Sequence, residues 1–236
     1  MSKLIMPSIL RPPQYGFTDR SLRFAGNVND AANVNNRIVN TQSFSVETMV
    51  KPDIPNMGST GGWVMNERGS SRGTDQWNYQ LFYNTSLGVF RLTIRVGGVN
   101  FSADTSVVVT DTWYHISGVC DAENGELRMY LNGVEEDNTS WSGTRDIQNT
   151  NFKLGLAGWA TFAASTRFAG ELSEVRVWDH TRTAEQIKRY SKVPLRGSET
   201  GLLAYYPINE GSGNTTEDKT GNGNNLSLQN NPTWIT

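Results

Sequence analysis

The chain has 236 residues and a formal net charge of −2, with 36% hydrophobic and 19% charged residues. This length gives room for one large all-β domain or two small ones, and the near-neutral charge argues against a nucleic-acid-binding protein. No apolar run approaches the roughly 18 residues that cross a bilayer, so membrane insertion is not expected.

The first 20 residues differ in composition from the rest of the chain. Pro7, Pro12 and Pro13 favour extended backbone and remove hydrogen-bond donors, while the apolar residues around them form a surface that needs cover. We predict that residues 1–20 form an extended N-terminal arm, which docks on other subunits or on a second copy of the chain. The apolar stretch near Met1 is too short for a signal-peptide core, which predicts synthesis in a cytoplasm.

Short β-patterned runs separated by Gly, Asn, Asp and Pro fill most of the chain. Residues 44–50, 90–96 and 127–131 alternate apolar with polar side chains, which is the period of a strand with one buried face. After the last of these runs, Asn132 and Gly133 supply the positive φ angles of a tight hairpin turn. The pattern predicts an all-β sandwich or jelly roll.

One short helix is predicted at about 183–191, where Thr183 and Gln186 match a capping box. Beyond it, apolar residues on both sides of a stretch rich in Gly and Asn predict two strands around an ordered loop. These strands fall at about 202–206 and 226–234.

Five segments together resemble the laminin G-like, pentraxin-related branch of the concanavalin A-like lectin/glucanase superfamily. They are SLRFAG (21–26), FSVETMVKPD (44–53), DTWYHISGVCDAENGELRMYLNGV (111–134), FAGELSEVRVWDHTRTAEQI (168–187) and GLLAYYPINEGSGNTTEDKTGNGNNLSLQNNPTW (201–234).

The resemblance implies a concanavalin A-like jelly-roll β-sandwich over residues 21–236. The last segment often opens such domains, so it either completes this sandwich or begins a second domain. Since about 35 residues cannot bury a core alone, we predict that residues 197–236 close the same sandwich. The resemblance leaves function open, because this fold serves lectins, glycosidases, adhesins and structural modules.

The sequence does not indicate an enzyme. Glucanases of this superfamily place carboxylates on alternate residues of one strand, and no E-x-D-x-E pattern occurs here. Glu135, Glu136 and Asp137 are consecutive, so neighbouring side chains point to opposite faces and are expected in a solvated turn. His115 and His180 form no metal-spaced pair, and His115 is expected to be a structural residue of a strand.

The resemblance also implies a structural calcium ion. Family members with a D-x-S/T-G-N-G-N loop often hold one, and the matching positions are Asp218, Gly221 and Asn222, with Asp30 and Glu174 as acidic candidates by family position. The alternative is that these residues supply turn geometry only. Residues 154–165 carry no carboxylate where pentraxins have an acidic calcium cluster, so a pentraxin-type phosphocholine site is not expected.

Aromatic side chains beside planar polar groups are typical of sugar-binding sites, because the apolar face of a sugar packs on a ring while its hydroxyls need fixed partners. Trp77, Tyr79 and Trp159 lie in or beside predicted loops, and Arg72 and Asp75 lie near the first two. We predict these five residues as the ligand site. The alternative is that the aromatic residues belong to the core.

Together these features predict a non-enzymatic binding or structural module. The main interpretation is a surface component of a bacteriophage virion, a decoration or tail adhesion protein made in the host cytoplasm, with cell-surface glycan as a candidate ligand. The alternative is a carbohydrate-binding or adhesion module of a larger secreted bacterial protein, placed outside the cell or at its surface. A glycosidase is the third interpretation.

Overall fold

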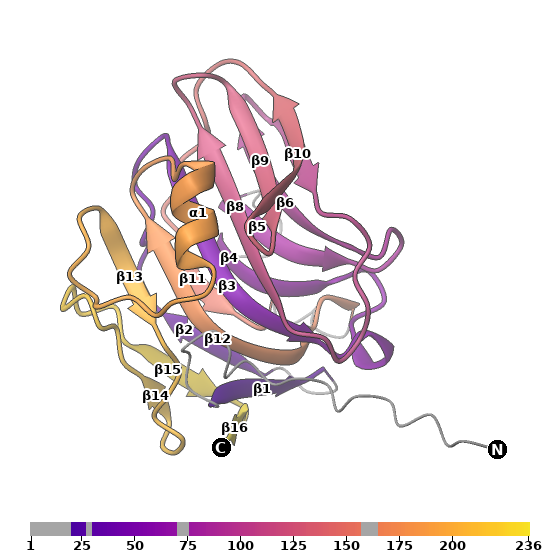
Figure 1. The fold of residues 1–236 in the computed structure, drawn as a ribbon, viewed down its shortest axis with the longest axis vertical. Coiled ribbons are helices and arrows are strands. Elements are labelled where there is room, and N and C mark those ends of the chain that lie inside the picture. The colour runs from indigo at the N-terminus through magenta and orange to yellow at the C-terminus, as the bar shows by residue number, and fades with distance from the viewer. Residues whose placement is uncertain (1–19, 27–29, 70–75, 157–164) are drawn as a thin grey trace.

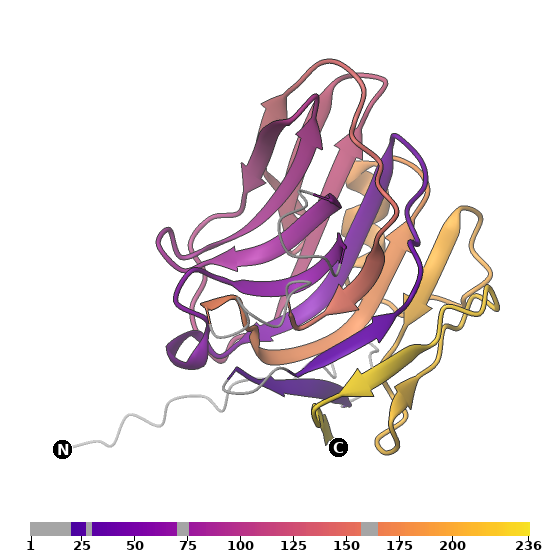
Figure 2. The same cartoon turned by 180° about the vertical axis from the view of Figure 1, so that it is seen from behind.

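The computed structural model describes residues 20–26, 30–69, 76–156 and 165–236. They form two antiparallel sheets packed face to face, with a short helix on the outside of the first sheet (Figures 1 and 2). The first sheet contains, in spatial order, β10 (Val134–Ser140), β9 (Glu126–Leu131), β8 (Tyr114–Asp121), β3 (Phe44–Pro52), β12 (Ala169–Trp178), β1 (Ser21–Ala25) and β16 (Thr233–Ile235), and β13 (Leu202–Tyr206) also pairs with β12.

The second sheet covers the inner face of the first. It contains, in spatial order, β14 (Thr215–Thr216), β15 (Leu226–Gln229), β2 (Ala31–Val34), β11 (Asn151–Leu154), β4 (Gly62–Arg68), β5 (Trp77–Asn84), β6 (Val89–Val96) and β7 (Val99–Asp104). A single turn of 3-10 helix, Ile54–Asn56, follows β3. Among the described residues, no helix is long and apolar enough to span a membrane.

The core lies between the two sheets, where alternate side chains of each strand meet. Buried residues of β3 and β8, such as Val46 and Ile116, join residues of β6, such as Phe90 and Leu92, in one continuous cluster. At Gly118 the sheets approach so closely that an added Cβ would lie 2.8 Å from a Leu92 methyl carbon. The predicted jelly-roll β-sandwich with one short helix is therefore confirmed.

The two local predictions with the clearest residue signals are also confirmed. Leu131 and Val134 pair across the β9–β10 hairpin, and Asn132 and Gly133 between them have φ angles of 52° and 80°. The helix α1 (Ala184–Tyr190) begins at a capping box in which the Thr183 and Gln186 side chains each accept from the other's backbone N–H.

Buried charged groups attach α1 to the first sheet. The Glu47 carboxylate lies 3.1 Å from His115 Nε2, 3.6 Å from Arg176 Nη1 and 3.5 Å from Arg182 Nε. Arg176 also donates to the carbonyl of Tyr190, the last residue of α1, at 2.8 Å. Burial lowers the pKa of His115, and this histidine serves the structural role expected from its place in a strand.

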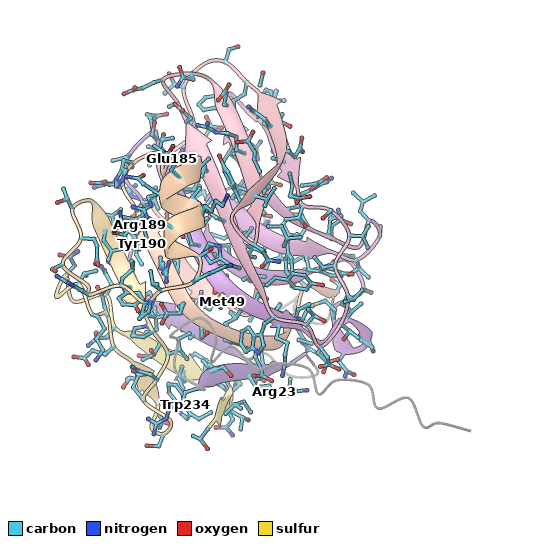
Figure 3. The ribbon with its side chains drawn as sticks, viewed as in Figure 1. Arg23, Met49, Glu185, Arg189, Tyr190 and Trp234 are labelled. Carbon is cyan, nitrogen blue, oxygen red and sulfur yellow. The ribbon has the colours of Figure 1, made fainter. Side chains whose placement is uncertain are left out.

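The C-terminal segment contributes strands to both sheets. β13 pairs with β12 and β16 with β1 in the first sheet, while β15 pairs with β2 in the second. Leu22 of β1 faces Trp234 of β16, near the bottom of the molecule in Figure 3. The predicted N-terminal arm falls outside the described residues, except for Arg20, which donates to the Asn209 carbonyl at 2.6 Å.

Candidate functional site

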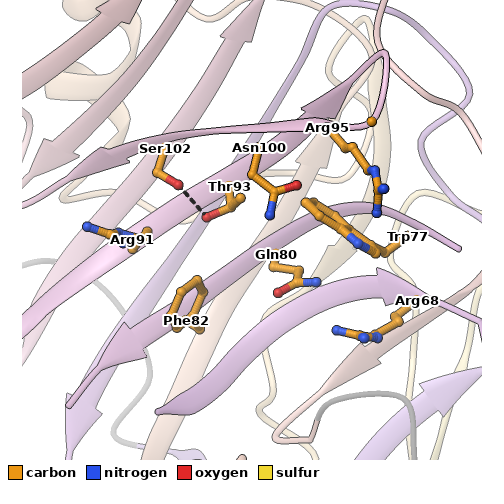
Figure 4. A pocket seen from close by; sticks show the side chains of 10 residues that line it. Arg68, Trp77, Gln80, Phe82, Arg91, Thr93, Arg95, Asn100 and Ser102 are labelled. Carbon is orange, nitrogen blue, oxygen red and sulfur yellow. Dashed lines mark hydrogen bonds between the residues drawn. The ribbon is translucent and has the colours of Figure 1, made fainter. Parts of the chain in front are cut away.

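A groove crosses the second sheet on the face turned away from the core. It spans β4 to β7 and has a volume of about 570 Å³ (Figure 4). Its lining residues are Arg68, Trp77, Gln80, Phe82, Arg91, Thr93, Arg95, Gly98, Asn100 and Ser102. Because these strands are antiparallel neighbours, side chains in register form rows across the groove.

We distinguish three rows. The aromatic row consists of Trp63, Phe82, Arg91 and Asp104. The central row consists of Gln80, Thr93 and Ser102. The basic row is made of two separate cross-strand pairs at one end of the groove, Arg68 with Trp77 and Arg95 with Asn100, because the β5–β6 pairing ends at Tyr79 and Ile94. Figure 4 draws the Trp77 ring between Arg68 and Arg95.

The aromatic row contains a flat stacked pair of rings. The ring centroids of Trp63 and Phe82 are 4.8 Å apart with an interplanar angle of 11°. Trp63 Nε1 donates to Gln80 Oε1 at 3.1 Å, which fixes the orientation of the amide in the next row. This part of the site offers an apolar ring surface beside an oriented amide.

The polar groups of β6 and β7 are held by cross-strand partners. Arg91 makes two hydrogen bonds to the Asp104 carboxylate, at 2.6 and 2.7 Å, and the Thr93 and Ser102 hydroxyl oxygens are 2.9 Å apart. Side chains held in this way lose little conformational freedom when a ligand binds. The groove is therefore preorganised.

A β-bulge places Trp77 in the groove. Tyr79 faces Glu67 across the β4–β5 pair, but the next matched pair is Trp77 with Arg68, so Asn78 is an extra residue without a partner. Regular alternation would put Trp77 on the core side with Tyr79. The bulge instead turns Trp77 to the groove, where it lines the wall although only 4% of its surface is exposed.

Buried hydrogen bonds hold Asn78 in this position. Its amide donates to Glu67 Oε2 at 2.8 Å and to Thr150 Oγ1 at 3.1 Å, and its side-chain oxygen accepts from the backbone N–H of Gln148 at 2.6 Å. Its backbone carbonyl accepts from Arg145 Nη1 at 3.2 Å. The bulge is thus fixed by side chains from β4 and from the segment before β11.

Glu67 connects this cluster to the segment between β2 and β3. Its Oε1 accepts from the backbone N–H groups of Ile38 and Val39, both at 2.7 Å. Burial raises the pKa of Glu67 to about 7, against the opposing effect of the hydrogen bonds from Asn78, Val39 and Ile38 and of the Arg145 charge. Glu67 therefore holds a proton more strongly in the folded chain than in the unfolded one.

Stability should consequently depend on pH through Glu67. A carboxyl group with a raised folded-state pKa contributes stability that is present below the unfolded value of 4.5 and is lost as the pH rises to about 7. We expect Glu67→Gln to flatten the dependence of the unfolding free energy on pH in this window, as measured by urea unfolding. An unchanged slope between pH 4.5 and 7 in the variant would contradict this assignment.

The structure separates the residues predicted as the ligand site. Trp77 lines the groove, but Tyr79 is fully buried and belongs to the core cluster, so it cannot contact a ligand in the groove. The prediction for Tyr79 is corrected, because the bulge at Asn78 puts these two residues on opposite faces. Arg72, Asp75 and Trp159 lie outside the described residues.

Sequence reasoning missed most of the groove. Gln80 and Phe82 alternate with core residues of β5, and Arg91, Thr93 and Arg95 alternate with core residues of β6. This alternation was visible in the run FRLTIRV, where every second side chain is polar. The sequence did not indicate that β4 to β7 are consecutive neighbours with these faces turned outward.

Three of the residues predicted to bind calcium share one loop, where Asp218 organises the backbone. Asp218 Oδ1 accepts from the backbone N–H groups of Tyr205 and Thr220 and from the Thr220 hydroxyl, and its Oδ2 accepts from the Asn224 N–H. Asn222 donates its amide to the Leu203 carbonyl at 3.0 Å. Gly221 has a φ of 79°, which fits a turn.

The other two predicted ligands have partners elsewhere. Glu174 Oε2 accepts from Arg176 Nη2 and from the Tyr205 hydroxyl, both at 2.9 Å, and Asp30 Oδ2 accepts from the Ala25 N–H at 3.0 Å. Among the described residues, no group of three or more His, Cys, Asp and Glu could hold a metal ion. The contacts of Asp218, Asn222 and Gly221 agree with the turn-geometry alternative.

Thermal melting distinguishes the turn-geometry alternative from calcium binding at this loop. Asp218→Ala removes several hydrogen bonds of the loop, so we expect the melting temperature to fall by about 5 °C. The fall should be equal in calcium and in chelator. A wild-type melting temperature that rises with calcium, and a gain that Asp218→Ala abolishes, would establish a metal role for the loop instead.

Comparison with known proteins identifies the fold. The laminin G-type family model described as "Concanavalin A-like lectin/glucanases superfamily" matches residues 25–188. No curated protein sequence matches the chain. A structure described as a "putative carbohydrate binding protein" from Bacteroides ovatus is similar, with 23% identity and a TM-score of 0.68, over 92% of this chain and 59% of that one.

Two further solved structures are similar to the chain. The CBM40 domain of the Ruminococcus gnavus IT-sialidase, bound to α2,3-sialyllactose, has 11% identity and a TM-score of 0.60, over 72% of this chain and 96% of that one. A heptameric SAP-like pentraxin from Limulus polyphemus has 18% identity and a TM-score of 0.58, over 73% of this chain and 81% of that one. At these identities the likeness establishes the fold and not the ligand.

Proposed function

Because this chain belongs to the concanavalin A-like lectin/glucanases superfamily, we propose that it is a carbohydrate-binding module that holds a glycan in the groove across β4 to β7. The observation that carries this proposal is the stacked Trp63–Phe82 pair beside the oriented amide of Gln80. A sugar ring can pack its apolar face on Phe82 while its hydroxyls reach the amide and the hydroxyls of the central row.

The side chains that line the groove suit binding rather than catalysis. Arginines, amides and hydroxyls supply the polar side chains of the described lining, apart from the Trp77 indole, and these groups do not exchange protons near neutral pH. Most glycosidases hydrolyse the glycosidic bond with a pair of acidic side chains. The lack of enzymatic activity nevertheless stays a prediction, to be tested on a broad panel of polysaccharides.

The setting that fits this proposal best is a module of a larger secreted or surface protein. The R. gnavus domain is part of a sialidase, and this chain spans 59% of the B. ovatus protein. Both comparisons support the alternative interpretation, a module of a larger secreted protein, better than they support the interpretation as a virion component. The virion interpretation, docking by the N-terminal arm and self-association stay predictions that depend on residues outside those described.

Two substitutions in the groove test the proposal. Phe82→Ala removes half of the stacked pair, and Asn100→Ala removes an exposed amide at the groove edge. We expect the wild-type chain to bind at least one member of a glycan array, and each variant to bind it about fivefold or more weakly, the effect of losing one neutral contact. Isothermal titration calorimetry measures the affinity of the wild type and of each variant for the glycans that bind on the array.

Asn138→Ala is the matched control, because Asn138 is also an exposed asparagine in an edge strand but lies in β10 of the other sheet. It should bind like the wild type. Affinity that is unchanged in both groove variants would place the glycan elsewhere and refute the proposed site. A wild-type chain that binds no glycan would refute the proposed function.

A further inference from the structure

A second pocket lies on the outside of the first sheet, away from the groove. It has a volume of about 340 Å³, and residues of β12, of β13 and of the segment that follows α1 line it. We call it the outer pocket. Leu195 and Tyr205 in its wall belong to a small apolar cluster that is separate from the main core. The volume is near the lower end of the range of small-molecule sites, about 300–1,000 Å³, and therefore suits a small ligand.

A β-bulge directs Glu174 to the outer pocket. Leu172 and Val175 both belong to the core cluster, although regular alternation would put Leu172 and Glu174 on the same face. The pairing of β12 with β3 shifts between Ser173 and Arg176, so that two residues of β12 oppose one residue of β3. The shift interrupts the alternation, and Glu174 lines the outer pocket instead of joining the core.

Two residues beside the outer pocket have left-handed backbone. Glu174 has a φ of 53°, and Ile208, which lies between the lining residues Pro207 and Asn209, has a φ of 58°. The Glu174 backbone N–H donates to the Pro207 carbonyl at 3.4 Å, which links the two positions. A β-branched residue rarely adopts this conformation. Strained backbone of this kind is concentrated at binding and catalytic sites, so the pair directs attention to the outer pocket.

The Glu174 carboxylate has one oxygen available for a ligand. Its Oε2 accepts from Arg176 Nη2 and from the Tyr205 hydroxyl, both at 2.9 Å. Among the described residues no donor reaches its Oε1, and this oxygen is not sealed from solvent although the residue is only 2% exposed. Burial raises the pKa of Glu174, against the opposing effect of the Arg176 charge. A ligand group that donates to Oε1 would supply the hydrogen bond that this buried carboxylate lacks.

Opposite charges also meet at the rim of the outer pocket. Lys219 contacts the Glu217 carboxylate, and the Glu199 carboxylate accepts from the backbone N–H of Arg196 at 2.8 Å. Together with the buried Glu174 ion pair, these contacts put an opposite charge close to each charged residue of the lining. An anionic ligand would meet Glu174 and a cationic one would meet the rim cations. The charge pattern therefore favours a neutral ligand.

We propose that the outer pocket binds a neutral molecule rich in hydroxyl groups, of the size of a monosaccharide or a cyclic polyol. A hydroxyl both donates and accepts, so one ligand can donate to Glu174 Oε1 and accept from the side chains of Asn209 and Lys219. Leu195 and Pro207 offer apolar surface to the C–H groups of its ring. This second site does not depend on the groove.

An NMR titration of the ¹⁵N-labelled chain locates the binding of small probes. The neutral probes are glucose, galactose, mannose, xylose, arabinose and myo-inositol, and glucuronate and glucosamine are charged relatives of glucose. We expect at least one neutral probe to shift the backbone amide signals of Leu195, Tyr205 and Lys219 until they saturate. This probe should bind more tightly than either charged relative, because each of those meets a like charge.

Two substitutions test the contacts. Glu174→Gln keeps the size of the side chain but puts a donor in place of an acceptor, and it should weaken binding of the neutral probe about fivefold or more. Asn209→Ala removes an amide at the rim and should weaken it about threefold. Glu185→Gln is the charge-matched control, because Glu185 is exposed on α1 (Figure 3). Thermal melting verifies that each variant is folded, and Asn209→Ala carries the test if Glu174→Gln unfolds.

The outcomes separate this proposal from the function proposed for the groove. Outer-pocket signals that stay unmoved with every probe overturn the proposal, as does tighter binding of glucuronate or glucosamine. Affinity unchanged in Asn209→Ala and in folded Glu174→Gln also overturns it. Phe82→Ala, which tests the groove, should leave binding at the outer pocket unchanged. Shifts confined to groove residues would support the proposed function and refute the second site.

Discussion

The site depends on one extra residue in β5. Asn78 has no partner across the β4–β5 pair, and this bulge brings Trp77 from the core side to the groove side. Buried groups hold the bulge, because the Glu67 carboxylate accepts from the Asn78 side-chain amide and the Arg145 guanidinium donates to its backbone carbonyl. A regular strand here would bury Trp77 against the first sheet and leave Arg68 without an aromatic neighbour in its row.

The register between the strands gives the two ends of the groove different side chains. Antiparallel pairing of β4 to β7 aligns polar and aromatic side chains into rows, so one end of the groove offers stacked rings and the other offers Arg68 and Arg95. The core holds these rows in place, because the alternate side chains of β4 to β7 pack between the two sheets. The arrangement of the described groove side chains therefore follows from strand pairing.

Local chemistry made much of the fold predictable from the sequence. The Asn132-Gly133 turn, the capping box at Thr183 and the alternation of the strands all act between near neighbours, and the structure confirms them. The groove was not predictable in the same way, since it depends on register between strands and on a bulge that inverts the alternation between Trp77 and Tyr79. Glu174 illustrates the same limit, because its carboxylate accepts from the Tyr205 hydroxyl of β13, and family position did not indicate that contact.

The most direct test of the account is an NMR titration that follows the tryptophan indole N–H signals as a glycan that the chain binds is added. The account predicts chemical-shift changes for Trp77 in the basic row and Trp63 in the aromatic row, which share the groove face. Trp178, buried beneath Arg182 on the other sheet, should stay unchanged. Shifts at Trp178 or Trp234 with Trp63 and Trp77 unmoved would contradict the account, since the ligand would then bind outside the groove.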